Sequence, residues 1–167
     1  MKFLSLSSLA LFVSLLFFGC NSDDDGPPKL DLEGDCMTAT INGEFFNGVD
    51  VTVTELVVGE SIFLTGGMTD PANGEAKTLG ITIARTDLEG PIPVGTYDVE
   101  DSIGAISGQY IEGPIAMPTS YELNSGTLVI LTHDTTAKRI EGEFDLEGAD
   151  IGGNAISITD GYFDIKY

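Results

Sequence analysis

The sequence predicts an all-β domain of antiparallel strands. Apolar and polar residues alternate along several short segments, and 21 glycines interrupt the chain. No long stretch shows the 3.6-residue period of an amphipathic helix. These observations predict about eight to ten strands, packed as a β-sandwich, with a lipocalin-like up-and-down barrel as the alternative.

The first predicted element is a hairpin. Apolar residues alternate from Met37 to Ile41, and Asn42-Gly43 follows, the dipeptide most favoured in two-residue hairpin turns. A second alternating segment holds Val49, Val51 and Val53.

The later strands follow the same rule. Alternation around Ile81 and from Ile140 to Leu146 predicts two of them, and residues 61–65 and 128–131, apolar on both faces, predict central strands. Near the end, the segments around Ile158 and Phe163 are separated by Asp160-Gly161, which predicts a turn. Gly108 and Gly142 lie within strands and indicate bends or bulges.

The N-terminus has the layout of a signal peptide. Lys2 is the only charge before Asp23, and the intervening run of mostly Leu, Phe, Val, Ala and Ser is too short for a membrane-crossing helix. We therefore expect a signal peptide at 1–19, an acidic flexible tether at 20–35 and one β-domain at 36–167.

Cys20 is the predicted lipid-attachment site. The segment Leu16-Phe17-Phe18-Gly19-Cys20 resembles a bacterial lipobox, although Phe17 stands where a standard lipobox has Leu. Acylation there implies anchoring in the outer membrane, since several acyl chains hold a protein stably. The alternative is an ordinary secreted protein.

The tether and the overall charge limit the partners. Removing residues 1–19 leaves 6 basic against 27 acidic residues, a net charge of −21. Such a charge repels nucleic acid and anionic lipid surfaces. Asp23, Asp24 and Asp25 fit a solvated tether, and they also resemble the signal that sends Bacteroidota lipoproteins to the cell surface.

No catalytic, cofactor or metal site is predicted. His133 is the only histidine, and its neighbour Asp134 would point to the opposite face of a strand, so we expect a strand-end or turn histidine. Asp98, Glu100 and Asp101 lack the spacing of a contiguous calcium loop, although a site assembled from several loops stays open.

Cys36 and the aromatic residues also allow predictions. Cys36, without a partner if Cys20 is acylated, is expected to behave as a small apolar residue where the domain begins. Of the adjacent Phe45 and Phe46 only one can face a core, so the other is expected to be exposed or on an edge. The tyrosines fit either core filling with hydroxyl-to-backbone bonds or an aromatic platform for a glycan or peptide.

The segments "MTATINGEFFNG", "GTY" and "IEGEFDLEGA…AISITDGYFDIKY" resemble a family of small uncharacterised Bacteroidota lipoproteins. Members often carry Trp after the first hairpin turn, where this chain has Phe45 and Phe46. The resemblance implies a β-domain on a lipid anchor and no known activity. We expect a non-enzymatic binding or envelope-interaction module whose partner is a glycan, a peptide or an envelope protein, with a carrier of small apolar ligands in a barrel cavity as the alternative.

Overall fold

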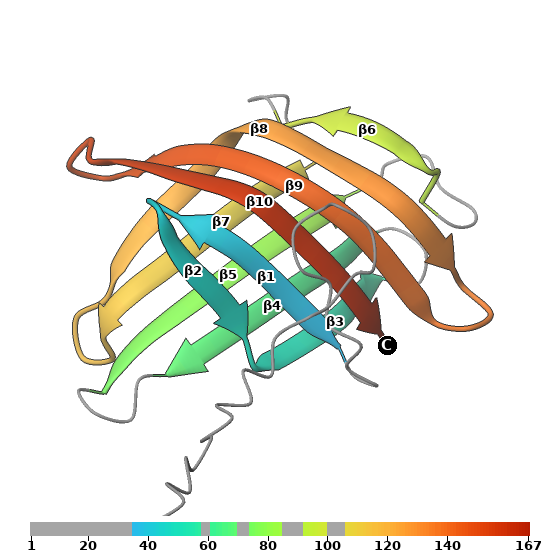
Figure 1. Cartoon of the computed structure of the whole chain (residues 1–167), viewed down its shortest axis with the longest axis horizontal. Coiled ribbons are helices and arrows are strands. Elements are labelled where there is room, and N and C mark those ends of the chain that lie inside the picture. The colour runs from blue at the N-terminus through green and yellow to red at the C-terminus, as the bar shows by residue number, and fades with distance from the viewer. Residues whose placement is uncertain (1–34, 58–60, 70–73, 85–91, 100–105) are drawn as a thin grey trace, which may run out of the picture.

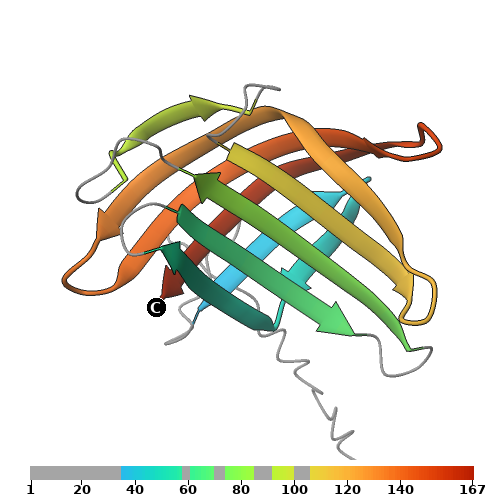
Figure 2. The ribbon, with the colours of Figure 1, turned by 180° about the vertical axis from the view of Figure 1, so that it is seen from behind.

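The computed structural model describes residues 35–57, 61–69, 74–84, 92–99 and 106–167. These residues form one antiparallel sheet of ten strands that is nearly closed into a barrel (Figures 1 and 2). The strands are β1 Cys36–Ile41, β2 Glu44–Gly48, β3 Asp50–Val57, β4 Ser61–Thr69, β5 Glu75–Ala84, β6 Gly95–Asp98, β7 Ile106–Pro114, β8 Thr119–Asp134, β9 Arg139–Asp150 and β10 Ala155–Lys166. The all-β prediction is confirmed. The preference for a two-sheet sandwich is wrong, and the barrel alternative is closer.

The sheet order explains why a sandwich does not form. Neighbouring strands run β2-β1-β10-β9-β8-β7-β5-β4-β3, and β6 pairs with β8 off this path. The two edge strands, β2 and β3, are consecutive in sequence and are separated only by Val49. One bent segment therefore pairs first with β1 and then with β4 and joins the two edges of the sheet.

Small residues allow the two edges to approach. The backbone N–H of Val49 donates to the Gly67 carbonyl over 2.9 Å. A Cβ on Gly48 would lie 3.0 Å from the Cα of Gly66, and one on Gly66 would lie 2.9 Å from the Met37 sulfur. Side chains at either position would push the edges apart, so glycine permits the closure.

The first hairpin is confirmed. The turn between β1 and β2 is Asn42-Gly43, with φ of 48° and 85°, as expected when both central residues are left-handed. The runs at 61–65 and 128–131 lie in β4 and β8, which pair on both sides, as predicted for central strands.

The turn predicted at Asp160-Gly161 is wrong. β10 continues through it, and the register against β9 shifts between Ile158 and Gly161, so the pair forms a β-bulge. Asp160 has a φ of 52°, and a Cβ on Gly161 would lie 2.3 Å from the Phe144 ring. The positive φ and the glycine bend a strand over a core ring.

The barrel is filled by alternate side chains of every long strand. The largest buried side chains, each less than 2% exposed, are Tyr110, Phe46, Phe163, Met37, Leu64, Leu79, Ile81, Leu123, Leu128, Ile130, Ile140 and Leu146. These side chains pack against one another in a single apolar cluster of the described residues.

The two ends of the barrel are distinct (Figure 1). We call proximal the end where β1 begins, β10 ends and the 135–138 turn lies. We call distal the opposite end, which carries the turns at 42–43, 115–118 and 151–154. At the proximal end the backbone N–H of Lys166 donates to the Asp35 carboxylate over 2.5 Å. The described chain therefore enters and leaves the barrel at the same end.

Candidate functional site

Polar side chains from four strands meet at the distal end. We call this group the distal cluster, and its members are Glu44, Lys77, Tyr110, Glu112 and Tyr121. In the sheet register Lys77 lies opposite Glu112, and Tyr110 lies opposite Tyr121. Glu112 follows Tyr110 by two residues and therefore shares its face of β7, the face that points into the barrel.

Glu112 is the centre of the cluster. Its carboxylate accepts the Tyr110 hydroxyl over 3.0 Å and the Tyr121 hydroxyl over 3.1 Å. The two rings are tilted against each other with centroids 5.9 Å apart. The Lys77 ammonium pairs with Glu44 over 3.0 Å. Tyr110 is wholly buried, whereas the Glu44 side chain is 76% exposed, so the cluster extends from the core to solvent.

The electrostatics keep both tyrosines protonated. Burial, followed by the hydrogen bond to Glu112 and nearby negative charges, raises the pKa of Tyr110 well above its usual value. The same causes, with a contribution from Asp150, raise the pKa of Tyr121. Both hydroxyls remain donors at neutral pH. Two carboxylates face one ammonium within the cluster, so its net charge is negative.

This arrangement suits binding. A ligand amine or hydroxyl could take the place of a tyrosine donor on Glu112 or of Lys77 on Glu44, because charge-assisted hydrogen bonds at a partly buried carboxylate are strong. Within the described part of the chain, no group of three or more His, Cys, Asp and Glu could hold a metal ion.

The distal cluster is not predictable from local sequence patterns. Its members are far apart in the chain, and only the strand register brings them together. One signal was available: Glu112 and Lys77 occupy inward positions of alternating strands, where apolar residues are expected.

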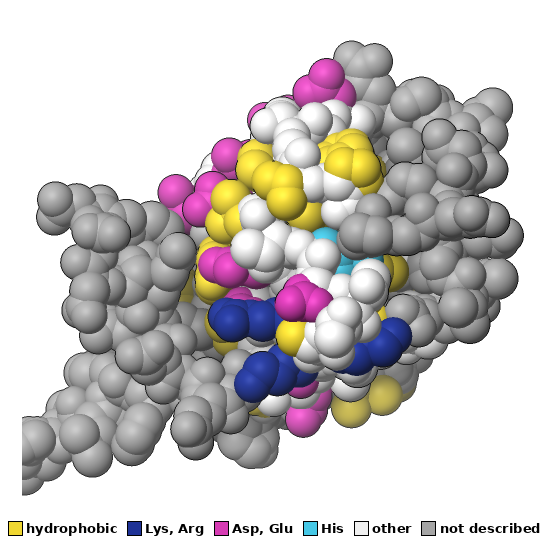
Figure 3. Space-filling view, turned by 90° about the vertical axis from the view of Figure 1, so that its right-hand side faces the viewer, with side chains coloured by type: hydrophobic (Ala, Val, Ile, Leu, Met, Phe, Trp, Pro, Cys, Tyr) yellow, Lys and Arg dark blue, Asp and Glu magenta, His cyan; other side chains and the backbone are white. Residues whose placement is uncertain are grey.

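His133 lies at the proximal end, as Figure 3 shows in cyan. It is the penultimate residue of β8, which confirms a strand-end histidine. Its Nδ1 accepts the Ile92 N–H over 2.7 Å, and its Nε2 lies 2.7 Å from the Tyr167 hydroxyl. An accepting Nδ1 in a neutral ring leaves the proton on Nε2, which then donates to Tyr167. His133 thus links the segment around Ile92 and the residue Tyr167 to β8.

Asp134 serves a separate purpose. Its carboxylate accepts the N–H groups of Thr136 and Ala137, both over 2.8 Å, and closes the 135–138 turn. These backbone bonds, Ala137 first, lower the pKa of Asp134. Asp134 and His133 both act in local structure.

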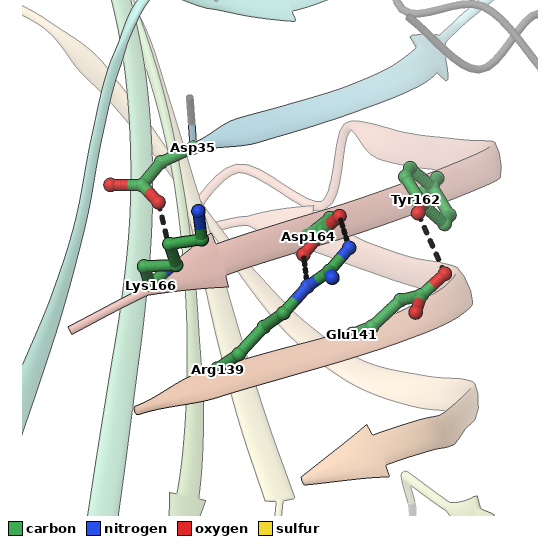
Figure 4. A network of polar contacts seen from close by, with 6 residues as sticks. All are labelled: Asp35, Arg139, Glu141, Tyr162, Asp164 and Lys166. Carbon is green, nitrogen blue, oxygen red and sulfur yellow. Dashed lines mark hydrogen bonds and ion pairs between the residues drawn. The ribbon is translucent and has the colours of Figure 1, made fainter. Parts of the chain in front are cut away.

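A second polar network covers the outer face of β9 and β10 (Figure 4). Arg139 makes a two-pronged ion pair with Asp164, and the Tyr162 hydroxyl donates to Glu141 over 2.8 Å. Burial, then the bond to Glu141, raises the pKa of Tyr162 above its usual value. This network joins neighbouring strands.

The remaining candidates divide into described and undescribed residues. Cys36 is buried at the start of β1, and Phe45 is 65% exposed beside the buried Phe46, so both predictions are confirmed. Asp98 ends β6 and is exposed. Cys20, Asp23, Asp24, Asp25, Glu100 and Asp101 lie outside the described residues.

The tyrosines use different partners from those expected. The Tyr97 hydroxyl does donate to a backbone group, the Pro93 carbonyl at 2.6 Å. The others bond to side chains: Tyr110 and Tyr121 to Glu112, Tyr162 to Glu141 and Tyr167 to His133.

Comparisons with known proteins do not place the chain in a family. No family model, curated protein or solved structure matches the chain. Within the residues that the structure describes, no helix has the length and apolarity of a membrane span.

Proposed function

We propose that the chain is a non-enzymatic, lipid-anchored binding protein of the cell envelope that takes a small ligand at the distal cluster. The observation that carries this proposal is the convergence of Glu44, Lys77, Glu112 and two tyrosine hydroxyls from four strands at one end of a rigid barrel. Binding sites occur preferentially at the ends of β-barrels, where a few polar groups fix the ligand.

The charge of the cluster selects the ligand class. Its carboxylates outnumber its ammonium, and the Asp150 charge also acts on Tyr121. We therefore expect a small ligand with an amine and several hydroxyls, such as an amino sugar, whose apolar face contacts the Tyr121 ring.

Thermal unfolding of the purified full-length chain tests the proposal. We expect glucosamine or a related amine to raise the midpoint, and glucuronic acid to leave it unchanged. Glu112→Gln should abolish the rise, whereas Glu122→Gln, a matched change at an exposed position of the adjacent strand, should preserve it. A rise that survives in Glu112→Gln would contradict the site.

The anchoring part has its own test. Metabolic labelling with an alkyne fatty acid should mark the parent protein and fail to mark Cys20→Ala. Equal labelling of the two proteins, or of neither, would contradict a lipid on Cys20 and would leave the ligand test unaffected.

The barrel shape favours a second candidate, a carrier of small apolar ligands, because closed barrels are the usual scaffold of such carriers. Here the ligand would have to displace core side chains such as Leu64 and Leu128, which expose no surface. Titration with a fluorescent fatty acid separates the two candidates. Saturable binding of one molecule that is unaffected by Glu112→Gln would favour the carrier.

A further inference from the structure

Four large apolar side chains are exposed to solvent at the distal end. They are Phe45 on β2, Ile115 and Met117 on the β7–β8 turn, and Ile151 on the β9–β10 turn. Met117 is 82% exposed, and Ile151 is fully exposed. Turn positions usually carry Gly, Asn, Asp, Ser or Pro, so isoleucine and methionine there expose apolar area without a structural gain. We call these four residues the distal tips.

The distal tips belong to one continuous edge. The sheet order β2-β1-β10-β9-β8-β7 makes the hairpins β1–β2, β9–β10 and β7–β8 consecutive neighbours. Their turns lie together at one end of the barrel in Figures 1 and 2. The Asn42 N–H and carboxamide oxygen bond to Ser157 and link the first turn to β10. Outside the tips, the exposed large apolar side chains of the described residues are Val49 between β2 and β3 and Val94 before β6.

Hydrogen bonds hold the turns in place. The Met117 N–H donates to the Pro114 carbonyl over 2.9 Å. Asp150 accepts the Asn154 backbone N–H at 2.8 Å and its side-chain amide at 2.7 Å, and these bonds lower the pKa of the Asp150 carboxyl. The tips are therefore presented on ordered turns, which reduces the entropy lost when a partner binds.

Acidic residues surround the tips. Glu44 precedes Phe45, Asp150 precedes Ile151, and Glu75 pairs with Pro114 beside Ile115. Among the described cations only Lys77 lies at this end, while Lys138, Arg139 and Lys166 lie at the proximal end, where Figure 3 shows the dark blue side chains. The distal surface therefore presents apolar contacts in a negative field.

We propose that the distal tips dock a cationic, amphipathic polypeptide segment of a partner protein. The negative field attracts lysine and arginine, and the tips supply the apolar contacts that give the complex its lifetime. A second copy of this chain carries the same negative charge and is repelled, as is an anionic lipid surface. The proposal rests on the proposed function only in assigning the distal end to binding.

Fluorescence anisotropy with synthetic peptides tests the docking. The probe is a labelled peptide of alternating Lys and Leu, measured with the purified full-length chain. The triple variant Ile115→Ser, Met117→Ser and Ile151→Ser should weaken binding at least tenfold. Val94→Ser, which changes another exposed apolar residue, at the proximal end, should not. A Lys-Ser peptide should bind at least tenfold more weakly than the probe, and raising salt to 0.5 M should weaken the probe severalfold.

Three outcomes would overturn the docking proposal. The first is equal probe binding by the parent and the triple variant. The second is self-association of the parent that the triple variant abolishes in sedimentation. The third is adsorption to phosphatidylcholine vesicles that depends on the same three residues. The triple variant separates this proposal from the small-ligand site, because it should weaken binding of the Lys-Leu probe and leave the amine effect on thermal unfolding intact.

Discussion

His133 and Asp134 at the proximal end differ from the distal cluster in their hydrogen-bond partners. His133 bonds to the backbone of Ile92 and to Tyr167, and Asp134 bonds to the backbone of its own turn. In the distal cluster Glu112, Tyr110 and Tyr121 bond to one another, and Lys77 bonds to the largely exposed Glu44. Groups that bond to backbone fix the fold, whereas side-chain groups near solvent can exchange partners. His133 and Asp134 therefore have a structural role, and the distal cluster is where we propose binding.

The largest effect is expected from Glu112→Ala. It leaves the buried Tyr110 hydroxyl without its acceptor, which should lower the free energy of unfolding by about 2–3 kcal/mol. Glu112→Gln keeps an acceptor oxygen and should cost less than about 1 kcal/mol. Urea unfolding measures both, and a loss for Glu112→Ala as small as that for Glu112→Gln would show that the Tyr110 hydroxyl does not depend on this acceptor.

His133→Phe probes the proximal end. Loss of the acceptor for the Ile92 N–H should lower the free energy of unfolding by about 1–2 kcal/mol. Ligand and peptide binding at the distal end should be unchanged in the folded variant. A distal binding defect in a fully folded His133→Phe protein would break the division between the ends.

Alkaline pH should destabilise the protein through the buried tyrosines. Because folding raises the pKa of Tyr110, the folded state holds its proton where the unfolded chain releases it. This stabilising effect is present below the ordinary tyrosine pKa of about 10 and declines at higher pH, by about 1.4 kcal/mol per pH unit for one group. Unfolding at pH 9 and pH 11 measures the slope. Tyr110→Phe should reduce this dependence of the unfolding free energy on pH. An unchanged slope would show that the dependence comes from other groups, such as Tyr162.

The smallest effect on stability is expected at the distal tips. Ile151→Ser should change the free energy of unfolding by less than about 0.5 kcal/mol, because surface side chains contribute little to folding. A larger loss in urea unfolding would mean that Ile151 packs against the barrel, and the tips would then have a structural role.

Local sequence signals predicted the strands better than their connections. Asn42-Gly43 and Asp160-Gly161 are similar turn dipeptides, yet the first makes a hairpin and the second a bulge. What separates them is the packing of Gly161 on Phe144, which the local sequence does not contain. Barrel closure could not be predicted from local sequence either, because it depends on the contact of Gly48 with Gly66.

The site was harder to predict than the fold. The exposure of Phe45 follows from strand alternation, but the bond of Tyr121 to Glu112 depends on the register between β7 and β8. Likewise Lys77 meets Glu44 only because the barrel closes. Each of these contacts requires a long-range pairing that composition and spacing leave open.

The pairing of β1 with β10 has a consequence for folding. Cys36 to Ile41 pair with residues 158–164, which lie near the other end of the described chain. The barrel therefore cannot close until both segments are available, and such long-range pairing folds slowly. Until β10 pairs, one edge of β1 stays open to pairing with another chain.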